Sequence, residues 1–591
     1  MTVYNAPITE MEFLIKDVFD LDTITALPGY EEATEDMVDA ILEEAGKLGR
    51  DIIAPLARTS DVENPIWKDN DVTTSPGFKE AYAQFIEGGW QGIGCDPEFG
   101  GMGLPFVLSN AVSEIWNSSS IAFGLCPMLT GGAIEALETH ASDEQKAIYL
   151  EKMVTGEWTG TMNLTEPSAG SDLAAVSTKA VPQDDGTYKI SGQKIFITFG
   201  EHDMTDNIIH LVLARTPDAP AGSRGISLFI VPKYLVNEDG SLGERNPAYC
   251  ISIEHKMGIH GSPTATMSFE EATGYLVKEE NKGLACMFTM MNNARLNVGN
   301  EGYAAAERAY QGAREYARER IQSPLLGSKD KTSVSIDKHP DVRRMLLTMK
   351  SKTEAARAIS YFAARQQDIF AKSDNDDARA NADALIQLLT PVVKAYSTDI
   401  GKEVADDGVQ VHGGMGFIEE SGAPQWLRDV RITAIYEGTN GIQANDLIGR
   451  KVAMNGGAYL DVLLPLVKAD VEAVKGTFPD MASALEVGIE NVEKATAWLV
   501  ESFKEDPKQA ATGSVHYLRL LGNVCGGWLL AKSALIAQSK LDAGEGDPTF
   551  MKAKINTAHF FAEQILPTSS ALKAMFTRGY GATLACEDDW L

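Results

Sequence analysis

The chain of 591 residues is too long for one hydrophobic core, so three or four structural units are expected. With 44% hydrophobic and 23% charged residues, its composition is that of an ordinary soluble globular protein. A net charge of −31 argues against a nucleic-acid partner, which requires clustered Lys and Arg, but not against a local basic pocket for a small anion.

Cysteine usage and hydropathy predict a cytoplasmic location. The six cysteines are widely scattered and form neither a C-x-x-C pair nor zinc-ligand spacing with a His. Most are therefore expected to be buried thiols in a reducing compartment. The acidic N-terminal stretch MTVYNAPITEMEFLIKDVFD is not expected to be a secretory signal, and no stretch of about 18 apolar residues predicts a membrane span.

Residues 1–155 predict a mainly helical domain. In ASDEQKAIYLEKMV, Ser142 is placed to cap a helix and Gln145 to complete a capping box. The stretch CDPEFGGMGLP, residues 95–105, predicts a loop because it holds two prolines and three glycines.

The hydrophobic period changes near residue 158. YKISGQKIFITF, NIIHLVLART, GISLFIVPKY and TATMSFEEA alternate or run apolar over short lengths, which predicts the strands of a β domain. Because no helical stretch separates these strands, a small antiparallel barrel or sandwich is expected rather than a parallel βαβ sheet.

Helices return after the β domain. The stretch 291–322, rich in Ala, Glu and Arg, predicts a long helix, and the polar stretch 323–340 predicts a connection. Another helix is expected to reach about residue 371, before the acidic loop KSDNDDARAN, and a further helix to end in HGGMGF. The predicted class is α+β, mainly α: a helical domain (1–155), a β-barrel domain (156–280), a helical bundle (281–455) and a C-terminal helical extension (456–591).

The motifs of several large enzyme classes are absent from the sequence. There is no G-x-G-x-x-G between a strand and a helix, no Walker loop, no H-E-x-x-H or other metal spacing and no G-x-S-x-G elbow. The nine His residues are dispersed, and His412, which stands beside glycines, is expected to have a structural role or to bond to solvent.

Several stretches could carry chemistry, and each also has an ordinary structural interpretation when taken alone. In MNLTEPSAGSD, hydroxyls and the backbone N–H groups around Gly170 could surround a polar ring or a phosphate, or the stretch could be a polar turn. In SGQKIFITFG, Phe196 and Thr198 share one strand face. They could offer an aromatic wall and a hydroxyl to a flat ligand, or Phe196 could lie in the core.

Two arginines and one glutamate are ambiguous in the same way. Arg295 and Arg320 could lie on a solvated helix face or pair with phosphates. The glycines of VQVHGGMGF could cap a helix or expose backbone to a pyrophosphate. Glu437 in IYEGTNGIQ could stabilise the start of a helix, with Thr439 or Asn440 as its cap, or accept a proton from a substrate.

The order of these motifs is more informative than any one of them. The chain contains LTEPSAGSD, GQKIFIT, KMGIHGSPT, ARLNVG, VQVHGGMGF and RDVRITAIYEGTNGIQ in this order. Over about residues 40–455 it resembles the acyl-CoA dehydrogenase flavoprotein family, and CDPEFGGMGLP resembles the family's N-terminal loop. The resemblance implies a helical domain, a β-barrel-like domain and a four-helix domain, with FAD between them and across a dimer interface.

The resemblance also implies which residues hold FAD. The flavin ring would meet Leu164, Thr165 and Phe196. The pyrophosphate would meet Gly170 and Ser171, and Arg320 would reach a neighbouring subunit's FAD. Gly441 stands where many members carry Gln, so that contact is expected to be lost. The predicted cofactor residues are Leu164, Thr165, Gly170, Ser171, Phe196, Thr198, Arg320, Gln410, Gly413, Gly414 and Thr439.

Glu437 matches the catalytic general base of the family. Some relatives place the base immediately before the Arg of ARLNVG, where this chain has Ala294 and hence no proton acceptor. The positions that match substrate contacts are Ser171, Arg295, Glu437 and Gly438.

The implied reaction is the FAD-dependent α,β-dehydrogenation of an acyl-CoA thioester, with an electron-transfer flavoprotein as the acceptor. The N-terminal YNAPITEMEFLIKDVFDLD and the C-terminal extension resemble a family subgroup that includes enzymes for 3-methylmercaptopropionyl-CoA in dimethylsulfoniopropionate breakdown and also enzymes for ordinary acyl-CoAs. We expect 3-methylmercaptopropionyl-CoA as the substrate and methylthioacryloyl-CoA as the product. A general short-, medium- or long-chain acyl-CoA dehydrogenase and an acyl-CoA oxidase are the alternatives. A homodimer without metal, nucleic acid or membrane partner is expected.

Overall fold

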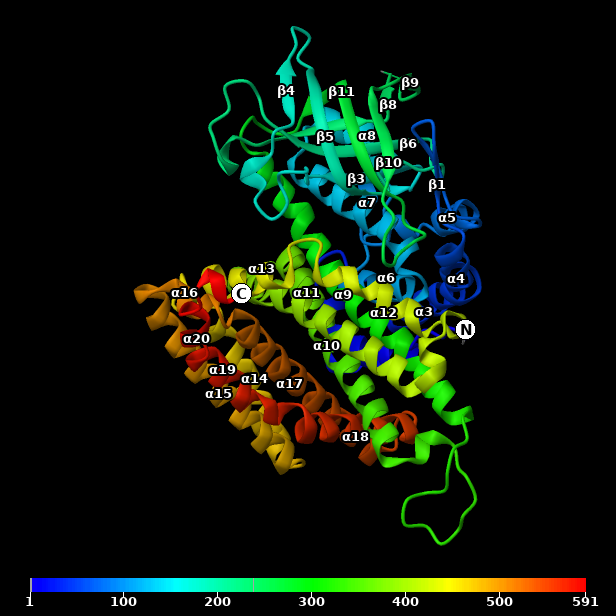
Figure 1. Ribbon diagram of the computed structural model, residues 1–591, viewed down its shortest axis with the longest axis vertical. Coiled ribbons are helices and arrows are strands. Elements are labelled where there is room, and N and C mark those ends of the chain that lie inside the picture. The colour runs from blue at the N-terminus through cyan, green and yellow to red at the C-terminus, as the bar shows by residue number, and fades with distance from the viewer. Residues whose placement is uncertain (1–2, 238) are drawn as a thin grey trace. The chain divides into compact units, whose positions relative to one another are not determined.

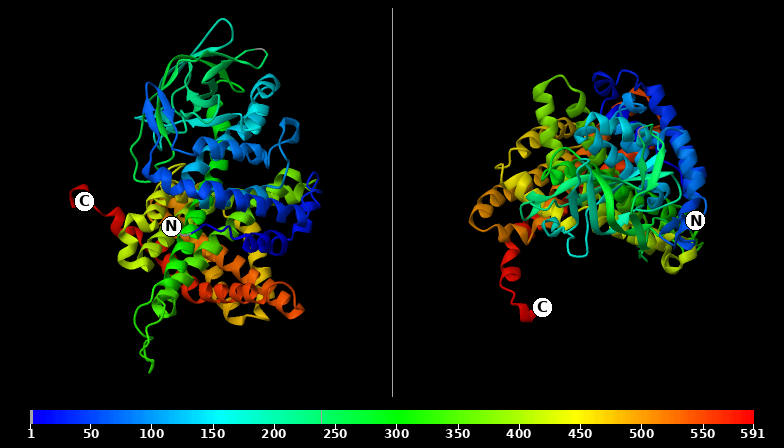
Figure 2. Two further views of the ribbon diagram at one scale, coloured as in Figure 1. Left: turned by 90° about the vertical axis from the view of Figure 1, so that its right-hand side faces the viewer. Right: turned by 90° about the horizontal axis from the view of Figure 1, so that it is seen from above.

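The computed structural model describes residues 3–237 and 239–591 (Figures 1 and 2). Its contacts divide the chain into two compact units. We call Met1–Gly46, Pro105–Ser118 and Arg295–Leu591 the helical unit, and Lys47–Leu104 with Ser119–Ala294 the sheet unit. The boundaries of the four predicted domains stay a prediction, because this grouping does not separate them.

A seven-stranded sheet forms the centre of the sheet unit. Its order is β3-β6-β7-β11-β5-β4, and β10 pairs with β11. Strands β3 and β6 are parallel, which differs from the purely antiparallel sheet expected from the sequence. Parallel strands need a long crossover, and here β4 and β5 supply it. The strands of this unit are β1 (Ile66–Lys68), β2 (Asp71–Thr73), β3 (Trp158–Asn163), β4 (Lys179–Pro182), β5 (Tyr188–Thr198), β6 (Asn207–Ala214), β7 (Ser227–Pro232), β8 (Tyr234–Val236), β9 (Leu242–Arg245), β10 (Ala248–Ile253) and β11 (Thr264–Leu276).

Central strands β6 and β7 are buried along their whole length, which explains their continuous apolar sequence. Ile209 and Leu211 face one core with helices α7 and α8, whereas Val212 and Ala214 face the other. The predicted capping box of α8 is present, with Gln145 N donating to Ser142 Oγ at 3.3 Å. The helices of this unit are α4 (Ala54–Val62), α5 (Phe78–Glu87), α7 (Ile121–His140) and α8 (Asp143–Val154).

The helical unit contains the long helices predicted after the β domain. Helix α11 begins at Asp376, inside the stretch predicted as an acidic loop, because Asn375 caps it and acidic side chains favour a helix N-terminus. Helices α3 (Glu35–Leu48), α6 (Phe106–Ser119) and α9 (Gly283–Glu319) continue from one unit into the other. The remaining helices are α1 (Ile8–Glu12), α2 (Leu21–Thr25), α10 (Pro340–Lys372), α11 (Asp376–His412), α12 (Ala423–Val430), α13 (Asn440–Asp446), α14 (Leu460–Lys475), α15 (Pro479–Glu505), α16 (Pro507–Ala511), α17 (Ser514–Ala543), α18 (Pro548–Gln564), α19 (Ser569–Arg578) and α20 (Tyr580–Leu584).

Glycines allow α9 and α11 to cross at very short distance. A Cβ atom on Gly302 would lie 2.6 Å from the backbone carbon of Ser397, and one on Gly401 would lie 2.4 Å from the carbonyl oxygen of Gly302. Any side chain at this crossing would push the helices apart. Next to it in sequence are Glu301 of α9 and, one turn before Ser397, Lys394 of α11.

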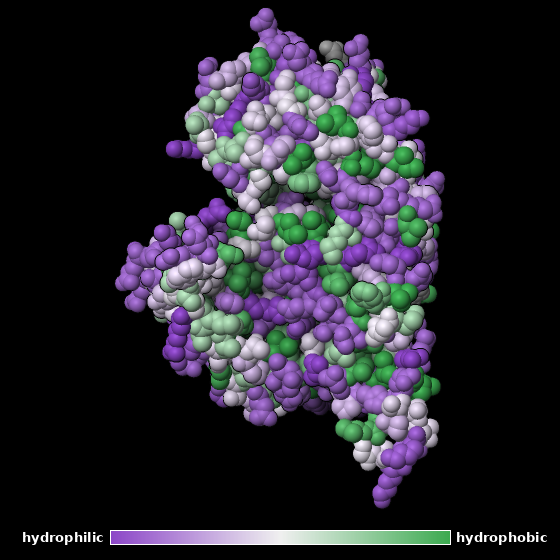
Figure 3. All heavy atoms as spheres, viewed as in Figure 1, coloured by the Kyte–Doolittle hydropathy of each residue, from purple (hydrophilic) through white to green (hydrophobic). Residues whose placement is uncertain are grey.

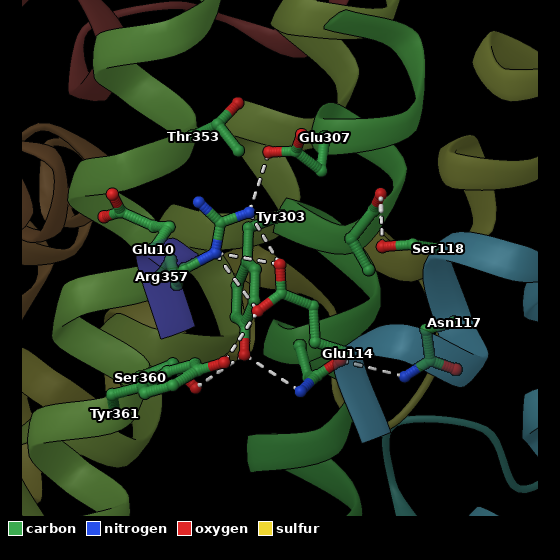
Figure 4. Close-up of polar contacts among 12 residues, drawn as sticks. Glu10, Glu114, Asn117, Ser118, Tyr303, Glu307, Thr353, Arg357, Ser360 and Tyr361 are labelled. Carbon is green, nitrogen blue, oxygen red and sulfur yellow. Dashed lines mark hydrogen bonds and ion pairs between the residues drawn. The ribbon is translucent and has the colours of Figure 1, made fainter. Parts of the chain in front are cut away.

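A buried ionic cluster fixes α6, α9 and α10 against one another (Figure 4). Arg357 Nη2 donates to Glu114 at 2.6 Å and to Glu307 at 2.8 Å, and Tyr361 OH donates to Glu114 at 3.0 Å. All four side chains are buried. Such charges are tolerated in a core because each one is paired and hydrogen-bonded.

A second buried ionic cluster ties the C-terminal extension to the rest of the helical unit. Lys554 of α18 donates to Glu10 of α1 at 2.6 Å and to Glu354 of α10 at 2.7 Å, and Lys350 also pairs with Glu354. Figure 1 shows α17 and α18 running beside α10. The extension is therefore part of the same packed body as the N-terminal helix.

Two core helices are long and apolar enough to cross a membrane by length and composition, contrary to the sequence-based expectation. In α7 and α17 respectively, 78% and 83% of the apolar window is buried inside the protein, as in core helices. Hydrophilic side chains dominate the face seen in Figure 3. The six cysteines are free thiols, and four of them are buried, as predicted.

Candidate active site

Glu437 lies in a strained turn between a 3-10 segment (Arg431–Ala434) and helix α13. Its φ of 57° and the φ of 81° at Gly438 both fall in the left-handed region, which a glycine adopts readily and a glutamate does not. Thr439 caps α13, with its Oγ1 accepting from Ile442 N at 3.2 Å. The capping role therefore belongs to Thr439, and the strained backbone at Glu437 is of the kind found at functional positions.

Gln443 and Arg295 lie beside Gly438, the glycine that follows Glu437. A Cβ atom on Gly438 would lie 2.6 Å from Gln443 Nε2 and 3.8 Å from Arg295 Nη2. The Gln443 amide donates long hydrogen bonds to the carbonyl oxygens of Gly438 (3.4 Å) and Glu437 (3.5 Å). The φ of 81° and these close side chains favour a glycine at position 438.

Asn440 anchors the turn to α11. Its Nδ2 donates to Thr398 Oγ1 and Asp399 Oδ1, both at 2.9 Å, and its Oδ1 accepts from Lys394 Nζ at 2.9 Å. Lys394 is fully buried, and burial lowers its pKa to about 8. The α13 N-terminus is thereby held beside a buried ammonium group.

The electrostatic environment suits Glu437 to proton abstraction near neutral pH. Burial raises the pKa of Glu437 to about 7, and the charges of Arg295 and Lys394 oppose that rise. A base with a pKa near the working pH is ionised in a large fraction of molecules and still binds a proton strongly. Arg295 is itself buried, and burial lowers its pKa.

Glu437 keeps its hydrogen-bonding groups available for a ligand. Within residues 3–237 and 239–591, neither its carboxylate nor its backbone N–H forms a hydrogen bond. Its side chain is half-buried. The alternative base position, Ala294, is buried on α9 and offers no proton acceptor. The site thus combines one carboxylate with one adjacent free N–H donor.

Sequence reasoning missed three polar residues close to Glu437: Glu301, Tyr436 and Lys394. The Tyr436 hydroxyl donates a short hydrogen bond to Glu301, which is fully buried on α9. Burial raises the pKa of Glu301 to about 8. Tyr436 could have been noticed as a neighbour of Glu437, but Glu301 and Lys394 lie in long helices where a charge usually indicates a solvated face.

The C-terminal ends of α9 and α11 carry another group of predicted cofactor residues. Gln410, Gly413 and Gly414 are exposed at the end of α11, and Arg320 is exposed directly after α9. Gly413 has a φ of 58°, and a Cβ atom on either glycine would meet no atom within 4 Å. The backbone of this segment is therefore open to a ligand.

His412 has the structural role expected of it. Its Nδ1 lies 2.7 Å from the carbonyl oxygen of Gly408, and its ring stacks on Tyr316 with a centroid distance of 4.6 Å. Both contacts stay within the α9 and α11 helices, so His412 stabilises the helix end that presents the glycines.

In the sheet unit, Glu166 organises the loop that follows β3. Its carboxylate accepts from Lys194 Nζ at 2.8 Å, from Thr178 Oγ1 at 2.6 Å and from Ser177 Oγ at 2.7 Å. Burial opposes the ionisation of Glu166, but these donors outweigh it and lower its pKa to about 2. Lys194 also donates to the carbonyl oxygen of Leu164 at 3.0 Å, which fixes the start of the loop.

This loop lies directly beside the strand that carries Phe196. Ile195 N donates to the carbonyl oxygen of Thr165 at 2.9 Å, and a bulge gives Phe196 a φ of 60°. Phe196 is 58% exposed, so it forms an open aromatic surface and not part of the core. Thr165 and Thr198 are half-buried, whereas Gly170 and Ser171 are exposed.

These features fit a flavin dinucleotide. The sheet unit offers an exposed aromatic ring and hydroxyls to a flat polar ring, and Gly170 has no atom within 4 Å of a Cβ position. The helical unit offers an open glycine backbone of the kind that accommodates a pyrophosphate. Among the residues that the structure describes, no cluster of His, Cys, Asp and Glu could hold a metal ion.

Sequence comparison assigns the chain to a family. Models described as the N-terminal, middle and C-terminal domains of acyl-CoA dehydrogenase match residues 35–157, 161–272 and 281–452. A further model, acetyl-CoA dehydrogenase C-terminal like, matches residues 463–587. The chain belongs to the acyl-CoA dehydrogenase family. As a member of this family it is an oxidoreductase of acyl-CoA thioesters, and its cofactor is FAD.

Three relatives illustrate how far the similarity extends. This acyl-CoA dehydrogenase is 49% identical over 581 residues to the 3-methylmercaptopropionyl-CoA dehydrogenase of Ruegeria pomeroyi. The aligned residues cover 97% of this chain and 98% of the Ruegeria protein. It is 36% identical to a butyryl-CoA dehydrogenase of Syntrophomonas wolfei over 96% of both chains. A solved acyl-CoA dehydrogenase complexed with FAD from Bacillus anthracis matches with a TM-score of 0.72 and 21% identity, over 98% of this chain and 93% of that one, which shows the shared fold.

Proposed function

We propose that this acyl-CoA dehydrogenase oxidises 3-methylmercaptopropionyl-CoA to methylthioacryloyl-CoA. The observation that carries the substrate assignment is 49% identity, over both the N-terminal and the C-terminal extension, to a protein named for that substrate. A general acyl-CoA dehydrogenase is the second candidate, because 36% identity to a butyryl-CoA dehydrogenase also spans nearly the whole chain.

Glu437 is the general base of the proposed reaction. Its carboxylate removes the proton from the carbon next to the thioester carbonyl, and its pKa of about 7 gives it the necessary basicity. Negative charge then develops on the thioester oxygen. The backbone N–H of Glu437 has no competing acceptor among the described residues and can donate to that oxygen.

Two buried cations adjust the strength of this base. Arg295 and Lys394 stabilise the ionised carboxylate of Glu437 before proton transfer and lose this attraction once it is protonated. Without them, burial alone would raise the pKa further and leave less of the active, ionised form. FAD, when bound, accepts the β-hydrogen together with its electron pair. In the sheet unit, Phe196 would offer its aromatic surface to a flavin ring. In the helical unit, Gly413 and Gly414 would offer open backbone to a pyrophosphate.

The electron acceptor, oligomeric state and location are also part of the proposal. An electron-transfer flavoprotein would reoxidise the cofactor, and two copies would pair in the cytoplasm. Pairing is supported by the exposed apolar side chains beside the open glycines, Met415 (50% exposed), Phe417 (86%) and Ile418 (44%). Sedimentation of the purified protein would give its mass, and a monomeric mass would contradict the pairing.

Anaerobic spectroscopy tests the substrate assignment. The purified protein should show flavin absorbance, and 3-methylmercaptopropionyl-CoA should bleach it. The kcat/KM for this substrate should be at least about tenfold above the kcat/KM for butyryl-CoA. A higher kcat/KM for butyryl-CoA would favour the general enzyme. Oxygen uptake equal to turnover, without an added acceptor, would favour an acyl-CoA oxidase. No bleaching with any acyl-CoA would overturn the dehydrogenase function.

Replacing the base tests the mechanism directly. Glu437→Gln should retain FAD and lower the rate of flavin reduction about 10²–10⁴-fold, because an amide cannot accept the proton. Stopped-flow absorbance measures this rate. Glu490→Gln, on the exposed face of α15, is the matched control and should react like the parent enzyme. A Glu437→Gln enzyme with near-parental turnover would show that another group is the base.

A further inference from the structure

Glu301 is a second, buried carboxyl group beside the base. It lies on α9 with 0% of its surface exposed, and its Oε2 accepts a short hydrogen bond from the Tyr436 hydroxyl. Its Oε1 has no hydrogen-bond partner among residues 3–237 and 239–591. Since Tyr436 immediately precedes Glu437, the carboxyl of Glu301 contacts the turn that carries the base.

Glu301 differs from the other buried glutamates of the helical unit because no cation is bonded to it. Glu114 is bonded to Arg357 and Glu354 to Lys554, which compensates their charges. Glu301 has only the neutral hydroxyl of Tyr436 as a bonded partner in the described chain. A fully buried carboxyl without a bonded cation is stable as the neutral acid.

The charges around Glu301 also favour the neutral acid. Burial is the largest influence and raises its pKa to about 8. The hydrogen bond from Tyr436 lowers the pKa, the charge of Glu437 raises it, and the charge of Lys394 lowers it. The charge of Asp429 acts on Tyr436, and the charges of Asp399 and Arg295 act on Lys394. As the pH rises, Glu437 therefore ionises before Glu301, which stays the neutral acid longer.

We propose that Glu301 is a positioning residue for proton abstraction, holding Tyr436 and the Glu437 turn in place as a neutral acid and disabling the site when it ionises. This inference rests on the proposed role of Glu437 as base. The turn at Glu437 is strained, so it persists only while its surroundings hold it. An ionised Glu301 would add a buried negative charge where the reaction must develop negative charge on the thioester oxygen.

The pH profile separates this role from simple core filling. In the parent enzyme, kcat/KM should rise through the pKa of Glu437 near 7 and fall again as Glu301 ionises above about 8. Glu301→Gln accepts the same hydrogen bond but cannot ionise. It should keep the acid limb and stay within about threefold of the parent at pH 7. At pH 9.5 its kcat/KM should exceed the parent's at least fivefold.

Two further variants test the hydrogen bond between Glu301 and Tyr436 from each of its ends. Glu301→Leu removes the acceptor for the Tyr436 hydroxyl and should lose at least tenfold in kcat, with FAD retained. Glu301→Gln keeps an acceptor at this position and should not show this loss. Tyr436→Phe removes a hydrogen bond that lowers the pKa of Glu301, so its alkaline limb should move to higher pH. Glu280 also accepts a hydrogen bond from a tyrosine, Tyr188 OH, at 2.9 Å, but on the exposed surface. Glu280→Gln is therefore the matched control and should have the parental pH profile.

The possible outcomes distinguish the inference from the proposed function. Superimposable profiles of the parent and Glu301→Gln between pH 6 and 9.5 would overturn the inference, because Glu301 would then only fill the core. A tenfold loss in Glu301→Gln at pH 7 would overturn it as well, since a charged group would be required. A parent enzyme whose flavin is not reduced by any acyl-CoA would instead refute the proposed function.

Discussion

Glu437 illustrates how the environment of a single residue changes the proton affinity of an ordinary carboxylate. Burial raises its pKa from the usual range to about 7, while Arg295 and Lys394 limit the rise. The left-handed backbone at Glu437 and Gly438 leaves its N–H and its carboxylate unbonded within the described chain. Backbone strain and charge balance therefore act together at this residue.

The acid limb of the pH profile is the prediction that belongs to this scale. Only the ionised form of Glu437 accepts a proton, and its pKa is raised, so activity should be lost at a higher pH than for an unperturbed glutamate. Below about pH 7, kcat/KM for flavin reduction should fall about tenfold per pH unit. Steady-state assays with an artificial acceptor measure it. A flat profile between pH 5 and 7 would contradict the perturbed pKa.

At the scale of elements, the crossing of α9 and α11 decides which polar groups surround the base. The helices touch through Gly302 and Gly401, and on either side of this contact they carry Glu301 and Lys394. Helix α13 joins the same assembly through Asn440, which is bonded to Lys394, Thr398 and Asp399. The charges around Glu437 thus depend on the close packing of α9 against α11 at Gly302 and Gly401.

A larger residue at the crossing should separate the helices. Gly302→Val places its Cβ atom 2.6 Å from backbone atoms of Ser397, which cannot move aside like a side chain. We expect a loss of about 2 kcal/mol or more in the free energy of unfolding, together with lower turnover. Urea denaturation followed by circular dichroism measures the first. Gly476→Ala, whose Cβ atom would meet nothing within 4 Å, serves as the control and should leave stability unchanged.

On the scale of the whole molecule, buried ionic clusters join segments that are far apart in sequence. Lys554, near the C-terminus, pairs with Glu10, near the N-terminus, and with Glu354 in α10. Arg357, less than one turn after Glu354, pairs with Glu114 and Glu307. The two extensions beyond the common family core are therefore bound to the bundle that presents the base.

Removing the shared cation of this cluster should destabilise the helical unit. Lys554→Met leaves Glu10 buried without its cation and Glu354 with Lys350 alone, and loss of one partner of a buried ion pair costs about 3–5 kcal/mol in comparable cases. The midpoint of thermal or urea unfolding measures the effect. Lys494→Met, in an exposed pair with Glu490, provides the comparison and should shift the midpoint little. An equal shift in both variants would show that burial of the cluster has no special effect.

Local sequence patterns and tertiary contacts determine different features of this protein. Local patterns predicted the helices, the strands β5, β6, β7 and β11, and the α8 capping box, because apolar period and cap residues act over a few positions. The ordered motifs predicted the family and proposed Glu437 as base. The parallel β3–β6 pair escaped prediction because strand pairing joins distant segments.

The polar surroundings of the base could be found only in the folded chain. Glu301, Lys394, Arg357 and Lys554 lie in long helices, where charged residues are normally solvated, and nothing in their local sequence indicates burial. Burial is decided by which helices pack together, and it is burial that shifts pKa values and makes ion pairs strong. The sequence by itself therefore determined the family and its type of chemistry, and tertiary packing decided the proton affinity and the positioning of Glu437, the carboxylate proposed to perform it.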